Sequence, residues 1–131
     1  MAANAIERWH DIVRARDPAR LEALLAEDVV FLSPVVHTPQ RGKAITTKYL
    51  AAALAVLGGP DFRYVGQWIW EKSAVLEFMT SIDGVEVNGV DIIGWNGEGL
   101  IDSFKVMVRP LKAIEAVRQK MAAALTRPTD P

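Results

Sequence analysis

The spacing of apolar and polar positions changes near the middle of the chain. Before residue 60, apolar residues recur three or four positions apart, which predicts helices over residues 2–15, 18–26 and 42–57. A short apolar run at residues 28–32 predicts one buried strand, which ends at Ser33-Pro34 because the residue before a proline is biased away from regular structure. From residue 62 onward, apolar and polar residues alternate, as is typical of strands with one buried face.

The alternating half of the chain predicts four strands and a closing helix. Two strands cover residues 62–70 and 74–82, two more form a hairpin within residues 84–110, and the helix covers residues 111–125. The turn of the hairpin, Asn96-Gly97-Glu98-Gly99, contains an Asn-Gly pair between apolar alternating runs, which strongly favours a tight connection. We therefore take this hairpin as the centre of the fold.

The order helix, helix, strand, helix, four strands, helix predicts an α+β domain in which one curved sheet wraps around helices. We expect a single domain at residues 2–125 and a frayed tail at 126–131. Residues 85–95 and 100–108 are apolar on both faces of their strands. Because helices cover only one face, we expect a second copy of the chain to cover the other, giving a homodimer through the outer face of the sheet.

Composition narrows the possible partners. The 131 residues carry a formal net charge of -1, which gives no electrostatic reason to expect nucleic acid or an anionic membrane. The absence of cysteine excludes disulfides and thiolate chemistry, and two distant histidines, His10 and His37, do not suggest a metal site. No apolar run is long enough to span a membrane. We therefore expect a cytoplasmic protein without cofactor or metal.

One acid stands where alternation predicts a buried position. Asp91 shares a strand face with Gly89, Ile93 and Trp95. A carboxyl in a dry pocket has a raised pKa and can exchange a proton near neutral pH. The alternative is a structural acid that ties the sheet to an arginine or a helix terminus.

The order of elements and two segments, LLAEDVVFLSP and VDIIGWNGEGLIDSFKVMVRP, resemble the NTF2-like superfamily, which includes SnoaL-like and ketosteroid-isomerase-like proteins. The resemblance covers about residues 5–125. It implies a cone of a strongly bent sheet and helices, a deep apolar pocket, and usually a dimer. The superfamily includes isomerases, cyclases, dehydratases, epoxide hydrolases and non-catalytic proteins, so the resemblance alone settles no activity.

The ketosteroid isomerases offer the sharpest comparison. In that resemblance Asp91 occupies the place of their oxyanion-hole aspartic acid. Ser33 stands where those enzymes carry the general-base aspartate, and Trp9 stands where they carry a tyrosine that donates to the oxyanion. A serine hydroxyl cannot take a proton from carbon unaided at neutral pH, and two of the three catalytic positions differ, so we expect the isomerase mechanism of that family to be absent from this chain.

The remaining candidates surround this position. His37 lies in a predicted loop and is a candidate base acting with Asp91, with a rim histidine bonded to loop backbone as the alternative. Aromatic and apolar strand residues form either a ligand wall or ordinary core: Trp68, Phe78, Trp95, Phe104 and Val108.

Together these observations favour a protein that binds a small apolar molecule near Asp91, with Trp9 and Ser33 beside it. If the protein is an enzyme, we expect cofactor-independent acid–base chemistry of the isomerase, dehydratase or hydrolase type, catalysed by Asp91 and His37. The alternative is a non-catalytic binding or dimerisation module in which Asp91 is structural.

Overall fold

The computed structural model describes residues 2–126. In chain order the elements are α1 (Ala2–Ala15), the 3-10 turn η1 (Pro18–Arg20), α2 (Leu21–Leu24), β1 (Leu25–Leu32), β2 (Gln40–Arg41), α3 (Lys43–Leu57), β3 (Arg63–Ile69), β4 (Ser73–Ile82), β5 (Val85–Trp95), β6 (Ile101–Arg109) and α4 (Leu111–Thr126).

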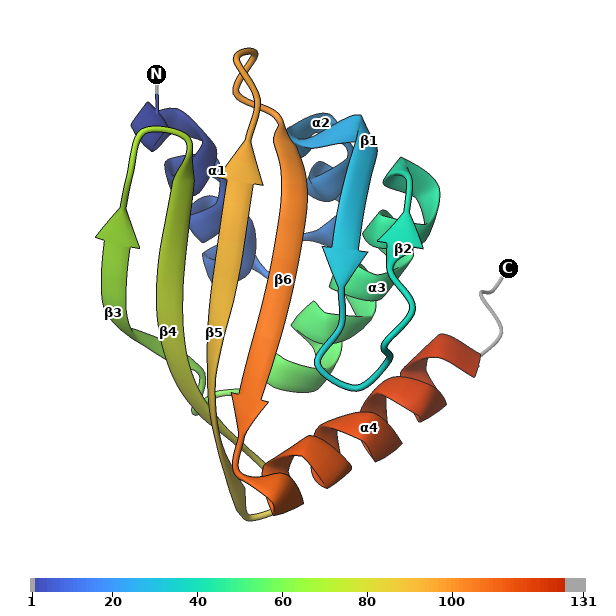
Figure 1. Cartoon of the computed structure of the whole chain (residues 1–131). Helices are drawn as coiled ribbons and strands as arrows, with labels where there is room; N and C mark the ends of the chain where they lie inside the picture. The colour runs from blue at the N-terminus through green and yellow to red at the C-terminus, as the bar shows by residue number, and fades with distance from the viewer. Residues whose placement is uncertain (1, 127–131) are drawn as a thin grey trace.

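The six strands form one sheet in the order β2-β1-β6-β5-β4-β3. Strands β1 and β6 run parallel and the other pairs run antiparallel. Helices α1 and α3 lie behind the sheet in Figure 1, and α4 crosses near its lower end, so one face of the sheet is left uncovered. This arrangement confirms the predicted α+β class. The prediction of a strongly curved sheet was wrong, because the sheet stays open and bends only moderately.

The central hairpin forms as its turn residues predict. The side-chain oxygen of Asn96 accepts hydrogen bonds from the backbone N–H groups of Glu98 and Leu100, at 2.9 and 3.1 Å. Gly99 adopts a φ of 79°, a left-handed conformation in which glycine has no steric penalty. The turn therefore fixes the register that pairs Asp91 with Val106.

The largest difference from the predicted elements lies at the second helix. It is reduced to η1 and the single turn of α2, and β1 begins at Leu25 rather than at residue 28. Leu24 and Leu25 are both fully buried. The apolar run that contains them is therefore compatible with a buried helix and with a buried strand. Leu25 pairs with Ile101 on β6, and this pairing makes residue 25 the first residue of the strand.

Strand alternation places the core on the helix-facing side of the sheet. Every second residue of β4 and β5 is buried, and Asp91 lies in this series as predicted. Among the residues whose burial the structure describes, the buried polar side chains are Asp91, which is ionisable, and Thr46 and Thr80. Asp91 therefore faces the helices.

A bulge in β3 changes the face of the residues that follow it. Tyr64 pairs with Phe78, but Gly66 pairs with Glu77, so one extra residue sits in β3 between these pairs. As a result Trp68 lies on the outer face and is 59% exposed. The expectation that Trp68 belongs to a ligand wall or to the core was wrong, because simple alternation does not account for the inserted residue.

Most of the predicted tail, residues 127–131, lies outside the described residues, and Thr126 is the last residue of α4. Within residues 2–126, no helix is both long and apolar enough to cross a membrane.

Candidate functional site

Three side chains from three elements form a hydrogen-bonded chain at the centre of the core. Tyr64 on β3 donates its hydroxyl proton to Oδ2 of Asp91 on β5, at 2.7 Å. Trp9 on α1 donates its indole N–H to the hydroxyl oxygen of Tyr64, at 2.9 Å. The indole ring also packs edge-to-face on Phe104 of β6, with centroids 4.9 Å apart, which fixes the direction of its N–H.

The hydrogen bonds of this chain run in one direction. An indole N–H can only donate, so the Tyr64 oxygen must accept from Trp9, and the Tyr64 proton must then go to Asp91. Oδ2 of Asp91 is therefore an acceptor. Oδ1 makes no hydrogen bond among the described residues, so a proton carried by Asp91 belongs on Oδ1.

Burial controls the protonation of this site. Loss of solvation raises the pKa of Asp91 from its ordinary value of 3.8 to about 7, while the hydrogen bond from Tyr64 opposes this shift. Burial also raises the pKa of Tyr64 well above its usual value, and the nearby Asp91 carboxylate raises it further. Asp91 therefore titrates near neutral pH, while Tyr64 stays protonated.

A narrow apolar cavity of about 50 Å³ adjoins Asp91. Its walls are mostly aliphatic and aromatic side chains, and its polar side chains are Ser33, Tyr64, Asp91 and the indole of Trp9. The cavity has room for only a few water-sized molecules, compared with roughly 300 Å³ or more in a typical small-molecule pocket. A larger ligand would require the surrounding side chains to move.

Ser33 is a polar residue of the cavity wall. Its Oγ accepts hydrogen bonds from the backbone N–H groups of Val35 and Val36, at 3.1 and 3.3 Å. These bonds occupy both lone pairs of the oxygen and form the turn that ends β1. The hydroxyl proton of Ser33 makes no hydrogen bond among the described residues.

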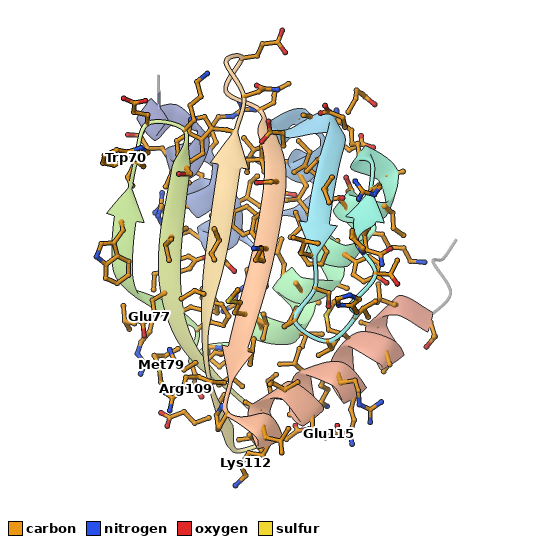
Figure 2. The ribbon with its side chains drawn as sticks, in the orientation of Figure 1. Trp70, Glu77, Met79, Arg109, Lys112 and Glu115 are labelled. Atoms are coloured by element: carbon orange, nitrogen blue, oxygen red, sulfur yellow. The ribbon has the colours of Figure 1, made fainter. Side chains whose placement is uncertain are left out.

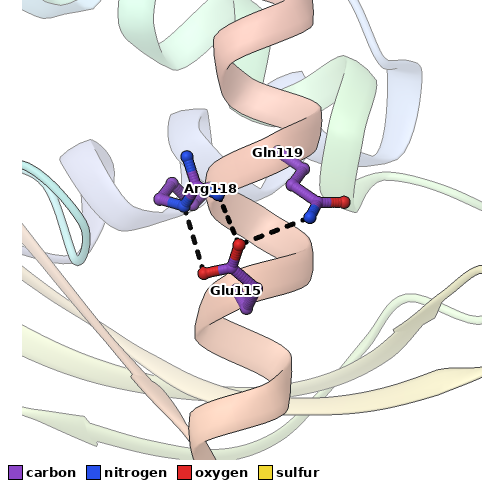
Figure 3. Close-up of polar contacts among 3 residues, drawn as sticks. All are labelled: Glu115, Arg118 and Gln119. Carbon is purple, nitrogen blue, oxygen red and sulfur yellow. Dashed lines mark hydrogen bonds and ion pairs between the residues drawn. The ribbon is translucent and has the colours of Figure 1, made fainter.

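Helix α4 covers one end of the cavity with Val117 and Met121, both of which are buried. Its opposite side faces solvent, where Glu115 accepts hydrogen bonds from Arg118 and Gln119 (Figure 3). The hydrogen bonds from Arg118 lower the pKa of Glu115. This exposed group is separate from the cavity.

The structure brings most of the predicted site residues together. The cavity wall contains Asp91 and five of the predicted neighbours: Trp9, Ser33, Phe78, Phe104 and Val108. Trp95 is buried on the same sheet face as Asp91 but does not line the cavity.

His37 is placed away from Asp91. It is exposed in the loop between β1 and β2 and does not line the cavity, so the expected pairing of His37 with Asp91 is absent. The reason is the turn at Ser33 followed by pairing of Gln40 with Phe31, which returns the loop to the edge of the sheet. Among the described residues, no group of three or more histidine, aspartate or glutamate side chains is arranged to hold a metal ion.

Sequence reasoning missed Tyr64 as a member of the site. The alternation that begins at residue 62 puts Phe62 and Tyr64 on the same strand face, and both residues line the cavity. The signal that could have identified Tyr64 is the need of a buried carboxyl for a hydrogen-bond donor.

Comparisons with known proteins agree with this architecture. The SnoaL-like domain family matches residues 6–104. A steroid delta-isomerase from Pseudomonas aeruginosa is 35% identical with a TM-score of 0.90, and the match covers 95% of this chain and 90% of that chain. An uncharacterised bacterial protein with a cystatin-like fold from Silicibacter pomeroyi DSS-3 is 34% identical with a TM-score of 0.84, over 91% of this chain and 83% of that chain.

A more distant structure, an NTF2-like protein of unknown function from Mesorhizobium loti, is 22% identical with a TM-score of 0.73, over 83% of this chain and 91% of that chain, and shows the fold alone. The search of curated proteins found no match. The predicted resemblance to the NTF2-like superfamily is thereby confirmed.

Proposed function

The chain belongs to the SnoaL-like domain family, and on that premise we propose that it binds a small apolar molecule beside Asp91 and isomerises it by cofactor-independent proton transfer. The observation that carries this proposal is a pair of hydrogen bonds, from Trp9 to Tyr64 and from Tyr64 to Asp91, that ends at a buried carboxyl with a pKa of about 7. Such a group gives and takes protons readily at neutral pH.

We assign the base to Asp91. The cavity wall contains two ionisable side chains, Tyr64 and Asp91, and Tyr64 stays protonated because its pKa is raised. His37 lies outside the cavity, so it is not in position to act as the base. Ionised Asp91 accepts one hydrogen bond from the protein and keeps Oδ1 free, which leaves it basic enough to take a proton from an activated carbon.

We assign the hydrogen-bond donor to Ser33, which lines the same cavity and whose proton makes no hydrogen bond among the described residues. With these assignments, the positions of Ser33 and Asp91 have the opposite roles from those in the ketosteroid isomerases that the sequence resembles. There the position of Ser33 holds the base and the position of Asp91 holds the donor. In this chain Asp91 is buried, and burial raises its pKa, which makes its carboxylate a stronger base.

The reaction that fits these roles is the conversion of a β,γ-unsaturated ketone into its conjugated isomer. The Asp91 carboxylate removes a proton from the carbon between the carbonyl and the double bond. The electron pair moves into a dienolate, whose oxygen accepts a hydrogen bond from Ser33. Asp91 then returns the proton to the far carbon of the former double bond, which restores the carboxylate and completes the isomerisation.

The resemblance to the Pseudomonas aeruginosa steroid delta-isomerase supports the isomerase type of reaction. The cavity of about 50 Å³ favours a ligand much smaller than a steroid in this conformation. A suitable probe is therefore the β,γ-unsaturated cyclohexenone, whose conjugated product is followed by ultraviolet absorbance.

We expect the wild-type protein to convert this ketone at a rate that rises with pH through about 7 and is constant above it, because Asp91 must be ionised. Ser33→Ala should lower the rate by about a hundredfold, the effect of losing one oxyanion donor, and Ser33→Thr should retain much of it. A rate that falls as pH rises through 7 would contradict the basic role of Asp91. Equal rates for both Ser33 variants would remove Ser33 from the mechanism.

A second function is favoured by the small volume of the cavity. With Asp91 bonded to Tyr64 and little free space beside it, the protein also fits a non-catalytic binding module with a structural acid. Absence of turnover with both the cyclohexenone and a β,γ-unsaturated steroid ketone would favour this alternative.

We further propose that two copies of the chain pair through the outer face of the sheet. Figure 2 looks onto this face, which no helix covers. Large apolar side chains are exposed there, including Trp68 at 59%, Met107 at 51% and Val65 at 50%. A face with so much exposed apolar surface is typical of a protein–protein contact.

Light scattering on the purified protein should therefore give the mass of a dimer. Met107→Glu should shift the mass toward the monomer, because it places a charge in the contact. Arg41→Gln, on the edge strand β2 and away from the exposed apolar side chains, serves as the control and should leave the dimer intact. A monomer mass for the wild-type protein would contradict the proposal.

A further inference from the structure

A second and larger hollow lies outside the apolar cavity, where the end of α1 meets the start of β3. Its volume is about 340 Å³, within the range of small-molecule sites. Four basic side chains line it, namely His10, Arg14, Arg16 and Arg63, and none of its lining residues within the described part of the chain is an aspartate or glutamate. A chain with a formal net charge of -1 thus gathers three arginines around one groove.

The positive charge of this groove is only partly neutralised. Arg14 pairs with Asp11 one turn earlier on α1. Arg63 donates from Nη1 to the backbone carbonyl of Asp61, at 3.0 Å, and makes no ion pair with the residues that the structure describes. Arg16 makes no ion pair within the described part of the chain. Arg16 and Arg63 are both exposed and available to an anion.

The backbone holds Arg16 at the groove in an unusual way. Arg16 has a φ of 52°, a left-handed conformation that favours glycine or asparagine. Its N–H donates to the carbonyl of Val13, and the N–H of Asp17 donates to the carbonyl of Ile12, both at 3.2 Å. These bonds end α1 and bring the Arg16 side chain to the groove.

The groove and the apolar cavity share a wall. Val13, Gly58, Phe62 and Tyr64 line both spaces. The hydroxyl of Tyr64 bonds to Asp91 in the interior, while the residue itself also borders the groove. A ligand held in the groove therefore lies next to the side chains that separate it from Asp91.

We propose that this groove binds the anionic group of an amphipathic organic anion, with Arg16 and Arg63 as its partners and the apolar part of the ligand against Phe62 and Tyr64. Guanidinium groups suit carboxylates, sulfonates and phosphates because they offer several donors in one plane. The proposal extends the proposed function by giving its substrate a charged end outside the cavity and an apolar end directed to Asp91. Only this link to turnover rests on the proposed function.

The test uses two fluorescent probes that share a ring system. Anilinonaphthalene sulfonate carries an anionic group, and phenylnaphthylamine is the same aromatic amine without it. Dissociation constants are measured for the wild-type protein, Arg16→Asn, Arg63→Gln and the double variant. Asparagine is chosen at position 16 because it tolerates the left-handed conformation, so the fold is preserved. Arg41→Gln on β2, at the opposite edge of the sheet from β3, is the matched control.

The double variant should bind the sulfonate about tenfold more weakly, with each single variant losing part of this affinity, since two charge-assisted contacts are removed. Binding of the neutral amine and the affinities of Arg41→Gln should change less than about twofold. Added salt should weaken sulfonate binding in the wild-type protein and not in the double variant.

Equal weakening of both probes, or unchanged sulfonate binding in the double variant, would overturn the proposal. Arginine-dependent sulfonate binding in a protein that isomerises no ketone would support the groove while rejecting the proposed reaction. The experiments therefore distinguish a failure of the anion-binding proposal from a failure of the proposed isomerisation.

Discussion

At about pH 8, Asp91→Asn is expected to raise the free energy of unfolding by up to roughly 4 kcal/mol, because the wild-type protein must bury an ionised carboxylate there. The pKa of Asp91 is about 7 in the folded protein and near 3.8 when the group is unperturbed. Asparagine keeps an acceptor for the Tyr64 hydroxyl without a charge.

The sign of the effect follows from the raised pKa. Between pH 3.8 and about 7 the folded protein retains a proton that the unfolded chain has lost. The wild-type protein is therefore most stable, with respect to this group, below pH 3.8, and it loses stability as pH rises to about 7. The two proteins should accordingly be closest in stability at low pH and differ most above neutrality.

Urea unfolding at a series of pH values checks this expectation. Asp28→Asn, which changes an exposed carboxyl on β1, is the control and should follow the wild-type protein. Ketone turnover by Asp91→Asn should fall by about 10² to 10⁴, the contribution of a positioned acid–base group. A variant as active as the wild-type protein, or one with the same dependence of stability on pH, would remove Asp91 from its assigned role.

Gly89→Ala is expected to destabilise the protein by about 3 kcal/mol, because the position has no room for a methyl group. An added Cβ would lie 2.4 Å from Cζ of Phe78 and 2.7 Å from the backbone oxygen of Met107. The Phe78 ring forms part of the cavity wall, and the Met107 oxygen belongs to β6, which pairs with β5. Relief therefore requires both the ring and the strand to shift.

Gly97→Ala is the matched control, since a Cβ there meets no atom within 4 Å and the residue lies in the turn of the same hairpin. Its stability should stay within about 0.5 kcal/mol of the wild-type value. Chemical unfolding of the two variants compares them directly. If Gly89→Ala proved as stable as Gly97→Ala, the close packing of Phe78 against β5 would be wrong.

The sequence predicted the face of Asp91 correctly because β4 and β5 alternate without interruption over their paired length. The same rule failed for Trp68, since the bulge between Tyr64 and Gly66 leaves no trace in the alternation. Trp68 is exposed because one extra residue is inserted in β3, and only the pairing of β3 with β4 reveals this insertion.

Two further differences between the predicted and the observed site, at Tyr64 and at His37, arise from distant contacts and from loop geometry. Tyr64 reaches Asp91 across the intervening strand β4, and its partnership depends on the registers of two strand pairs. The position of His37 depends on a loop with two prolines, whose path no periodic pattern describes. The chemistry of this site was therefore less predictable than its fold.

Asp91 is expected to titrate near neutral pH while it faces the cavity. The most direct test is carbon NMR of the side-chain carboxyl groups in protein labelled at aspartate, with Asp91→Asn used to assign the Asp91 signal. We expect a midpoint at about pH 7, and a higher midpoint in Tyr64→Phe, because the Tyr64 hydrogen bond lowers the pKa of Asp91. A midpoint near the ordinary value of 3.8 would show a hydrated carboxylate and would contradict the account.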